Sequence, residues 1–388
     1  IAIIGSGAYL GNLINMGLVH APYWQSLDTD SFIADFTLKF PLLLTTLPLT
    51  MIPSIIGVVT CFIWYRKTKA SQSWRIALYG VIAGFLISAI YHIPTNFGFL
   101  GGEFTQETTA IRLQWWVNLH WVRTAFALLT AVYSVLGFKT TIDDTGYPAP
   151  ESYPGMDLVW SDEFDGTTVN LQNWTYDLGS NGWGNNEWQN YTNSSSNSSV
   201  SNGALTITAR QEGSSYSSAR LKTQGLQDFQ FGRIDIRAKL PEGQGIWPAI
   251  WMLGINIADG GWPQCGEIDI MEMVGHEAST AHGTAHWGSE WNFHQYSGSS
   301  ITLPNGEHFS EEFHLFSVDW QEDQITWYMD NQEFYSIGAN QMNGQPYPFN
   351  ASFFFIMNVA VGGDWPGYPD ATTTFPQEMI VDFVRVFQ

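Results

Sequence analysis

Cysteine is almost absent from this chain. Its 388 residues include two cysteines, Cys61 and Cys265, and these lie in segments of very different composition. No disulfide framework is therefore implied. A unit of roughly 240 residues can be stabilised by core burial alone, so this scarcity does not identify a cellular compartment. No Cys–His pairing is evident, and we interpret Cys265 as a small packed residue beside the strand that follows it.

Basic residues are also scarce, and the second part of the chain has fewest. Residues 1–150 hold eight of the 15 Lys and Arg and seven of the 36 Asp and Glu, so residues 151–388 hold the other seven and 29. Phosphate binding needs basic patches, and this balance excludes a nucleic-acid partner. The acidity suits solubility or a salty medium, in which repulsion between like charges is screened.

Charge of either sign is nearly missing from long stretches of the first part. Residues 40–65, 74–94 and 113–138 are each long and apolar enough to cross a bilayer, and residues 1–24 resemble a further span. A signal peptide is the alternative for 1–24, but the segment lacks a basic start and a small-residue cleavage site. Together the four runs predict a transmembrane bundle of about four helices over 1–138.

Three ionisable residues interrupt these runs, namely His92, His120 and Arg123. The segment 116–124, together with Tyr91-His92, resembles an anthrone-oxygenase-like family of small four-helix membrane proteins. Ionisable groups within a membrane segment are expensive and suggest function. The alternative, which we favour, is a network of interhelical hydrogen bonds that stabilises the bundle.

The pattern changes after the apolar runs. Residues 139–157 are polar and proline-rich, which predicts a semi-extended linker. From 158 to 388 the chain lacks long helical patterns, and several segments alternate apolar and polar residues as half-buried strands do, with a hairpin turn at Asp330-Asn331. Many short strands separated by Gly, Asn and Pro predict a β-sandwich. The alternating segments are 205–209, 233–240, 324–329 and 379–387.

Three carboxylates stand within one short apolar segment, Glu267-Ile-Asp-Ile-Met-Glu272. Simple alternation places Glu267 and Asp269 on one face of a strand and Glu272 on the other. One extra residue, a β-bulge around Ile270-Met271, would return Glu272 to the face of the other two. Two carboxylates at close range are the machinery of a retaining glycosidase. A solvated strand face is the alternative, but the apolar residues between the acids argue against it.

The segment 266–272 resembles the active-site signature of glycoside hydrolase family 16, in the laminarinase (endo-1,3-β-glucanase) form with one residue inserted. Matching segments are 158–164, 182–187, 245–253 and 357–366. The resemblance implies a concanavalin A-like jelly-roll sandwich over 158–388. It also implies that Glu267 is the nucleophile and Glu272 the acid and base, and that Asp269 between them helps to set their unequal pKa values.

Aromatic residues are abundant around this segment, and sugar rings stack on indoles. Trp247 and Trp251, four apart on one strand, are expected to share a face, and the resemblance places such tryptophans in sugar subsites. For Trp160, Trp320 and Trp327 we favour packing in the core. The other substrate-binding candidates are Trp183, Asn185, Asn186, Glu187, Trp262, His286, Trp287 and Asn358.

A metal requirement for the chemistry is not expected. His282 and His286 have the spacing of a metal pair, but no third ligand stands near, and zinc is improbable. The resemblance instead implies a structural Ca²⁺ away from the cleft, with Glu163, Gly203 and Asp382 at the matching positions. An ordinary acidic surface is the alternative.

The sequence thus predicts a retaining endo-β-1,3-glucanase, with β-glucan as its partner, tethered to a lipid bilayer. The alternatives are an inactive carbohydrate-binding module, or an oxygenase-like membrane protein with an accessory or artefactually fused glucanase. The one basic cluster, 66–75, indicates that this loop is cytoplasmic, which would leave the glucanase inside as well. Because polysaccharides do not cross membranes, we nevertheless expect an extracytoplasmic glucanase, although the positions of the charges predict the opposite.

Overall fold

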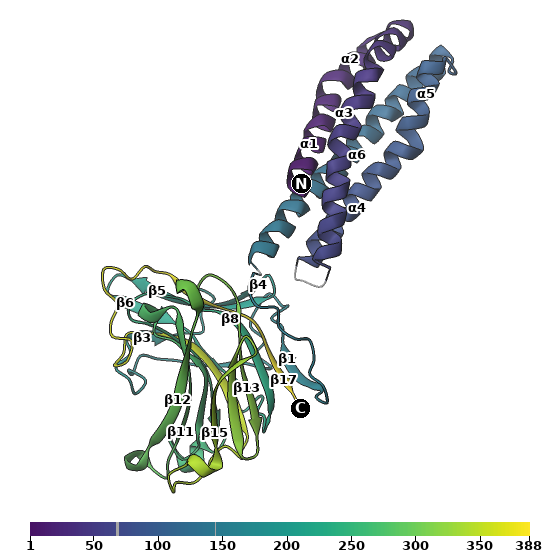
Figure 1. The fold of residues 1–388 in the computed structure, drawn as a ribbon. Helices are drawn as coiled ribbons and strands as arrows, with labels where there is room; N and C mark the ends of the chain where they lie inside the picture. Colours follow the sequence, from purple (N-terminus) through teal and green to yellow (C-terminus); the bar gives the residue numbers. More distant parts are fainter. Residues whose placement is uncertain (67–69, 144) are drawn as a thin grey trace. The chain divides into compact units, whose positions relative to one another are not determined.

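The computed structural model describes residues 1–66, 70–143 and 145–388, which form two compact units, Ile1–Asp144 and Thr145–Gln388. The first unit is helical and the second is built from β-strands, as Figure 1 shows. Each unit is described by itself below.

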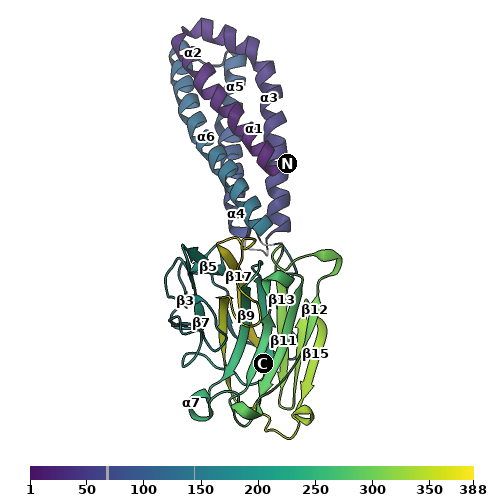
Figure 2. The same cartoon turned by 90° about the vertical axis from the view of Figure 1, so that its left-hand side faces the viewer.

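The helical unit consists of long apolar helices. Four segments among the described residues are long and apolar enough to span a membrane: Ala2–Ser26, Thr29–Trp64, Ser71–Gly101 and Gln106–Thr140. The first and third each contain one wide π-helical turn, Met16–His20 and Ser88–His92. Figure 2 shows the four segments running alongside one another. The individual helices are α1 (Ala2–Asn15), α2 (Ala21–Ser26), α3 (Thr29–Trp64), α4 (Ser71–Ile87), α5 (Ile93–Gly101) and α6 (Gln106–Asp143).

The start of the second helix differs most from the sequence expectation. Helix α3 begins at Thr29, eleven residues before the apolar run, because Asp28 caps it by accepting a hydrogen bond from Ser31 N at 3.0 Å. The predicted spans otherwise fall within the observed helices. Two residues of the basic cluster that guided the topology prediction, Lys67 and Lys69, lie outside the described residues.

The ionisable residues of the bundle form the interhelical network that we favoured. His120 Nε2 lies 2.9 Å from Leu13 O on α1, and Arg123 Nη1 donates to Ser88 Oγ at 3.2 Å. His92 Nε2 lies 3.1 Å from Trp116 O. The resemblance to anthrone-oxygenase-like proteins stays a prediction.

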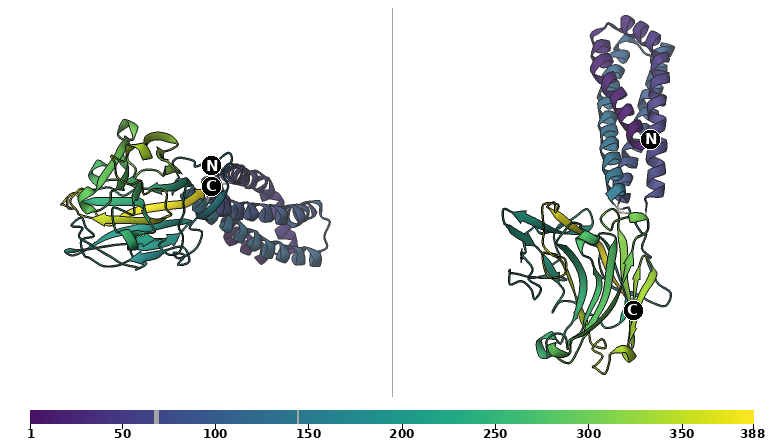
Figure 3. Two further views of the ribbon diagram at one scale, coloured as in Figure 1. Left: turned by 90° about the horizontal axis from the view of Figure 1, so that it is seen from below. Right: turned by 60° about the vertical axis from the view of Figure 1, so that its left-hand side comes forward.

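The second unit is a sandwich of two sheets (Figure 3), which are antiparallel except for the parallel pairing of β3 with β6. In the ten-stranded sheet the order is β15-β14-β13-β8-β17-β5-β6-β3, with β1 paired to β17 and β4 to β5. Its strands are β1 (Leu158–Asp162), β3 (Gln189–Tyr191), β4 (Ser198–Ser201), β5 (Ala204–Glu212), β6 (Ser215–Ser218), β8 (Gly232–Lys239), β13 (His314–Gln321), β14 (Gln324–Met329), β15 (Gln332–Gly338) and β17 (Gln377–Phe387).

The seven-stranded sheet has the order β12-β11-β10-β9-β16-β7-β2 and supplies the candidate site. Its strands are β2 (Thr175–Asp177), β7 (Arg220–Lys222), β9 (Ile246–Gly254), β10 (Glu267–Glu272), β11 (Thr280–Trp287), β12 (Gln295–Thr302) and β16 (Phe353–Val361). Helical turns in the connections are α7 (Ile257–Gly260) and the 3₁₀ segments Gly275–Glu277, Trp291–Phe293, Pro304–Gly306 and Ala339–Gln341. The predicted hairpin is confirmed, since Asp330 and Asn331 both adopt the left-handed conformation between β14 and β15.

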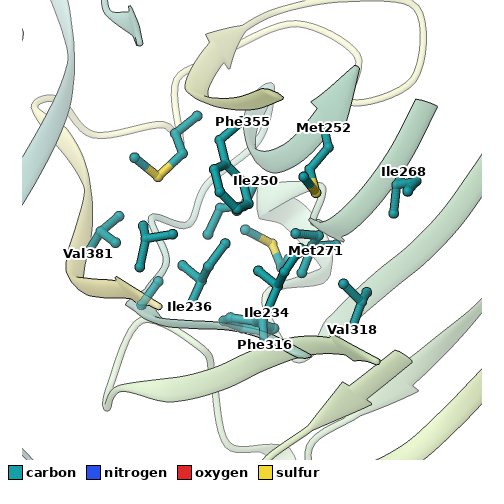
Figure 4. Close-up of a cluster of buried hydrophobic side chains, with 14 of the residues drawn as sticks. Ile234, Ile236, Ile250, Met252, Ile268, Met271, Phe316, Val318, Phe355 and Val381 are labelled. Carbon is teal, nitrogen blue, oxygen red and sulfur yellow. The ribbon is translucent and has the colours of Figure 1, made fainter. Parts of the chain in front are cut away.

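The core lies between the two sheets. Figure 4 shows Ile234 and Ile236 of β8 facing Ile250 of β9 and Met271 of β10, all of them buried. Burying each such side chain stabilises the fold by about 1.5–3 kcal/mol. Trp320 and Trp327 are fully buried and Trp160 packs against the same cluster, so the prediction that these three are core residues is confirmed.

The predicted linker over 139–157 differs from the structure at both ends. Helix α6 continues to Asp143, because Lys139 to Asp143 include no proline or glycine to stop it. Beyond it, Tyr147 N donates to Phe313 O at 2.8 Å, and Tyr153 OH donates to Asp235 Oδ2 at 2.7 Å. This segment is therefore fastened along the ten-stranded sheet and is not a free spacer.

Candidate active site

Strand β10 carries the three carboxylates, and it contains the predicted bulge. Asp269 pairs with Trp251 of β9 while Met271 pairs with the adjacent Ile250, so Ile270 is the extra residue. Glu272 then pairs with Ala249, two positions along β9 from the partner of Asp269. Consequently Glu272 lines the same cleft as Glu267 and Asp269. The bulge prediction is confirmed.

Each glutamate receives one indole hydrogen bond. Trp262 Nε1 donates to Glu267 Oε2 at 3.0 Å, and Trp247 Nε1 donates to Glu272 Oε1 at 3.1 Å. His286 Nε2 lies 3.1 Å from Asp269 Oδ2 and 4.0 Å from Glu267 Oε1. The two glutamates are thus oriented by indole N–H groups, which hold a carboxylate in place without neutralising it.

The environment raises the pKa of all three acids. Burial, and then the charge of Asp269, raise the pKa of Glu267 to about 8. Burial also raises the pKa of Asp269 to about 8. The pKa of Glu272 is also raised well above its ordinary value, by burial and then by the charges of Asp269 and Glu267. The charges of His286 and Arg220 and the hydrogen bond from Trp262 favour the ionised form of Glu267, and His286 and Trp247 favour that of Glu272. One ionised carboxylate and one protonated acid is the state that double displacement requires.

The carboxylates lie in a cleft of about 560 Å³ with an aromatic wall. Trp247 and Trp251 share its surface, as their spacing on β9 predicted, and Trp251 Nε1 donates to Asn358 Oδ1 at 2.9 Å. Indole faces beside polar side chains suit sugar rings, which present C–H faces and hydroxyl edges. The predicted binding residues that line the cleft are Trp183, Asn185, Glu187, Trp247, Trp251, Trp262, His286 and Asn358.

Glu187 is held by its neighbours at one end of the cleft. Asn185 Nδ2 donates to its Oε1 at 3.0 Å, and Gln189 Nε2 and Tyr191 OH donate to its Oε2 at 2.6 and 3.3 Å. Burial nevertheless raises the pKa of Glu187. A fixed acid of this kind can accept hydrogen bonds from substrate hydroxyls.

Two predicted binding residues do not line the cleft. Trp287 is 1% exposed and its Nε1 donates to Met342 O within the core, because alternation along β11 turns it away from the face of His286. Asn186 is exposed, and its Nδ2 lies 3.0 Å from both carboxylate oxygens of Asp364. The prediction is wrong for Trp287 as a cleft residue, and Asn186 has a loop-stabilising contact instead.

The cleft is also lined by four aromatic or charged residues that were not among the predicted binding residues: Arg220, Trp291, His294 and Trp365. The Arg220 guanidinium lies between two indoles, 4.9 Å from the ring centre of Trp183 and 4.8 Å from that of Trp251. His294 Nε2 lies 2.9 Å from His286 Nδ1, and its ring stacks on that of His286. Only the alternation of β7 hinted at Arg220; the others depend on loop and hairpin geometry.

The predicted calcium positions are adjacent but already engaged. Strand pairing brings the end of β1, the start of β5 and the middle of β17 together, and with them Glu163, Gly203 and Asp382. However, both oxygens of Glu163 bind Arg385 at 2.8 Å, and Asp382 Oδ2 accepts from Arg237 Nη1 at 2.8 Å. These carboxylates do not fit a Ca²⁺ ligand set while they hold arginines. A structural calcium stays a prediction.

One cluster of potential metal ligands occurs among the described residues, and it lies within the cleft. Atoms of Glu267, Asp269 and His286 lie within 4.8 Å of one another. His282, the other half of the histidine pair noted in the sequence, does not belong to it. The same three groups line one cleft with Glu272, where they are available for acid–base chemistry.

The comparisons agree with this geometry. The model of Glycosyl hydrolases family 16 matches residues 185–384. The chain is 39% identical over 285 residues to a beta-glucanase of Rhodothermus marinus, covering 69% of this chain and 94% of that protein. It is also 39% identical over 269 residues to glucan endo-1,3-beta-glucosidase A1 of Niallia circulans, of which it spans only 39%.

Among solved structures, the laminarinase catalytic domain of Thermotoga maritima superposes with a TM-score of 0.56 and 45% sequence identity. The match covers 60% of this chain and 98% of that domain. Family model, relatives and superposition all fall on the sandwich that carries the three carboxylates. The chain therefore belongs to glycosyl hydrolases family 16.

Proposed function

We propose that the sandwich unit cleaves internal β-1,3 linkages of laminarin-type glucans with retention of configuration. The observation that carries the proposal is the bulged strand β10, which presents Glu267 and Glu272 to one aromatic cleft. The names of the relatives support the substrate class, since they include an endo-1,3-beta-glucosidase and a laminarinase.

In the first step, Glu267 attacks the anomeric carbon and the glycosidic C–O bond breaks. Glu272 donates its proton to the departing oxygen, which leaves as a sugar hydroxyl, and a glycosyl ester forms on Glu267. The raised pKa of Glu272 keeps that proton available near neutral pH. The indole hydrogen bond from Trp262 helps Glu267 to remain ionised.

In the second step, water attacks the anomeric carbon and the ester bond breaks. Glu272, now ionised, accepts the water proton, and the sugar leaves with its original configuration. Asp269 stands between the two glutamates and acts through them. Its charge adds to the effect of burial in raising the pKa of Glu272, and His286 Nε2 lies 3.1 Å from its Oδ2.

The test is a substrate comparison with the full chain. Laminarin should be cleaved faster than lichenan, and agarose and carrageenan should not be cleaved. The initial product observed by NMR should carry the β-anomer. A Glu267→Ala variant is the matched control for contaminating activity. Faster lichenan cleavage would move the protein to another branch of the family, and an initial α-anomer would overturn the retaining mechanism.

We further propose that the four apolar segments anchor the protein in a membrane, with the glucanase outside the cytoplasm. The length and composition of the segments support anchoring. The side follows from the substrate, because a glucan polymer cannot reach a cytoplasmic enzyme. Protease treatment of intact cells provides the test: the sandwich should be removed before permeabilisation. Its survival until the membrane is opened would place it inside, as the charged loop suggests.

A further inference from the structure

The helical unit contains a pocket that the glucanase chemistry does not use. It has a volume of about 170 Å³ and lies among α1, α3, α6 and the π-helical turn Ser88–His92. Most of its wall is aliphatic or aromatic, and Leu44, which is 60% exposed, brings it to the outer surface of the bundle. A cavity of about 150 Å³ is enough to hold a benzene ring, so this pocket can hold part of a small apolar molecule.

The polar end of the pocket carries an uncompensated positive charge. Arg123 lines the pocket and is 3% exposed. Its guanidinium contacts His120 Nδ1 at 2.8 and 3.2 Å and donates to Ser88 Oγ at 3.2 Å. Among the described residues no carboxylate forms an ion pair with it, whereas Asp35 on α3 is paired with Lys39.

His120 does not supply the missing negative charge or add a positive one. A guanidinium can only donate hydrogen bonds, so His120 Nδ1 must accept from Arg123. The proton then resides on His120 Nε2, which lies 2.9 Å from Leu13 O. The ring is therefore neutral, and Arg123 leaves one net positive charge at the end of the pocket.

The other polar groups around this charge are hydrogen-bond donors. Asn96 uses its Oδ1 to accept from Trp116 Nε1 at 2.9 Å, so its Nδ2 has no partner among the described residues. Tyr9, whose hydroxyl can donate a hydrogen bond, also lines the pocket. A buried cation is costly unless an anion pairs with it, and the donors beside it favour oxygen as the partner atom.

We propose that this pocket binds a long-chain carboxylate, with its head at Arg123 and its tail leaving past Leu44 toward the lipid. A single carboxylate charge matches the single positive charge, and its two oxygens can accept from the guanidinium fork and from Asn96. The aliphatic wall accommodates the chain. The π-helical turns support a site here, because Met16 and Ser88, which line it, belong to two such turns, and π-turns often occur where a helix serves a ligand.

The probes are oleate and its uncharged isostere oleamide, added to the full chain in detergent micelles and counted as adducts by native mass spectrometry. Oleate should bind saturably with one molecule per chain, and at least about tenfold more tightly than oleamide, which corresponds to about 1.4 kcal/mol. Arg123→Gln should lower oleate affinity to that of oleamide. Leu47→Trp, which fills the pocket and keeps the charge, should weaken both ligands.

Arg112→Gln is the matched control, because Arg112 is an exposed arginine on the same helix and should not alter binding. Equal affinity for oleate and oleamide in the wild-type chain would overturn the proposal, even if the Arg123 variant fails to fold. Non-saturable oleate uptake, or tighter binding of a lysophosphatidate than of oleate, would also overturn it, since the pocket would then not select a carboxylate.

Discussion

Both sheets of the sandwich contain acidic residues with little exposure to solvent, but the hydrogen-bond donors to these acids differ between the sheets. In the ten-stranded sheet, Asp235 accepts from Arg233 Nε at 2.7 Å and from Tyr153 OH, and Asp382 accepts from Arg237. In the seven-stranded sheet, the hydrogen bonds to Glu267 and Glu272 come from neutral indoles.

The difference separates charges that stabilise the fold from charges that react. A carboxylate paired with a guanidinium is compensated for its lost hydration and stays ionised. The acids on β10 form no ion pair with an arginine or lysine among the described residues, and burial raises the pKa of all three. Replacing acids in the two sheets should therefore have opposite consequences for activity and for stability.

The largest effect is expected from the acids on β10. Glu267→Ala and Glu272→Ala should each lower kcat on laminarin by a factor of at least about 10³, since both residues act in every turnover. Folding should be retained, because each change removes a poorly hydrated acid. Azide should restore turnover in Glu267→Ala and give product of inverted configuration. Wild-type kcat in either variant would contradict the assigned roles.

The same substitution in the ten-stranded sheet should act on stability. Asp235→Ala leaves the Arg233 guanidinium buried without its carboxylate, which should cost about 3–5 kcal/mol of unfolding free energy. Denaturant titration measures this loss. The kcat of the folded fraction should match that of the wild type. A catalytic defect without a stability defect would break the comparison between the sheets.

Two tryptophans on opposite sides of the seven-stranded sheet sharpen the comparison. Trp262→Phe removes the N–H donor to Glu267, and the loss of a hydrogen bond to a charged group, about 1.5–3 kcal/mol, should lower kcat/KM roughly 10- to 100-fold. Trp287→Phe also removes one indole donor, but that donor lies in the core and binds Met342 O. It should lower the midpoint of thermal unfolding and leave kcat/KM unchanged. Equal kinetic effects would mean that Trp262 acts only by packing.

The smallest expected effect is a dependence of stability on pH. Glu267 has a pKa of about 8 in the folded protein against 4.5 ordinarily, so the folded state binds its proton more tightly. The resulting contribution to the free energy of unfolding is fully present below pH 4.5 and is lost as pH rises through 8. Glu267→Gln should therefore reduce the loss of thermal stability between pH 5 and pH 8 by a few degrees, measured by calorimetry. An unchanged pH dependence would indicate that Glu267 is not the group concerned.

The sequence was sufficient to predict the carboxylates and their common face. Three acids among apolar residues in six positions can share one face only if one residue is extra, and the structure contains that residue, Ile270. Trp287 was within reach of the same logic, because a neighbour of His286 on a regular strand must face the other way. The four apolar spans could also be predicted, because a candidate membrane span is recognised by its length and composition alone.

Other features depend on pairing between segments that the sequence does not specify. His294 reaches the cleft because β11 and β12 form a hairpin that sets Tyr296 opposite His286. Arg220 is placed by the pairing of β7 with β16, which sets it opposite Asn358. The ion pairs of Glu163 with Arg385 and of Asp382 with Arg237 also depend on strand pairing, which the sequence does not specify.

The bulge in β10 also bears on how this enzyme could change its length during evolution. Ile270 and Met271 both point into the core, 1% and 0% exposed, while Asp269 and Glu272 remain opposite Trp251 and Ala249. A strand lacking one of these two residues would return to regular alternation and still set its acids opposite the same partners. A one-residue deletion here should therefore remove one core side chain and leave the catalytic pair in register.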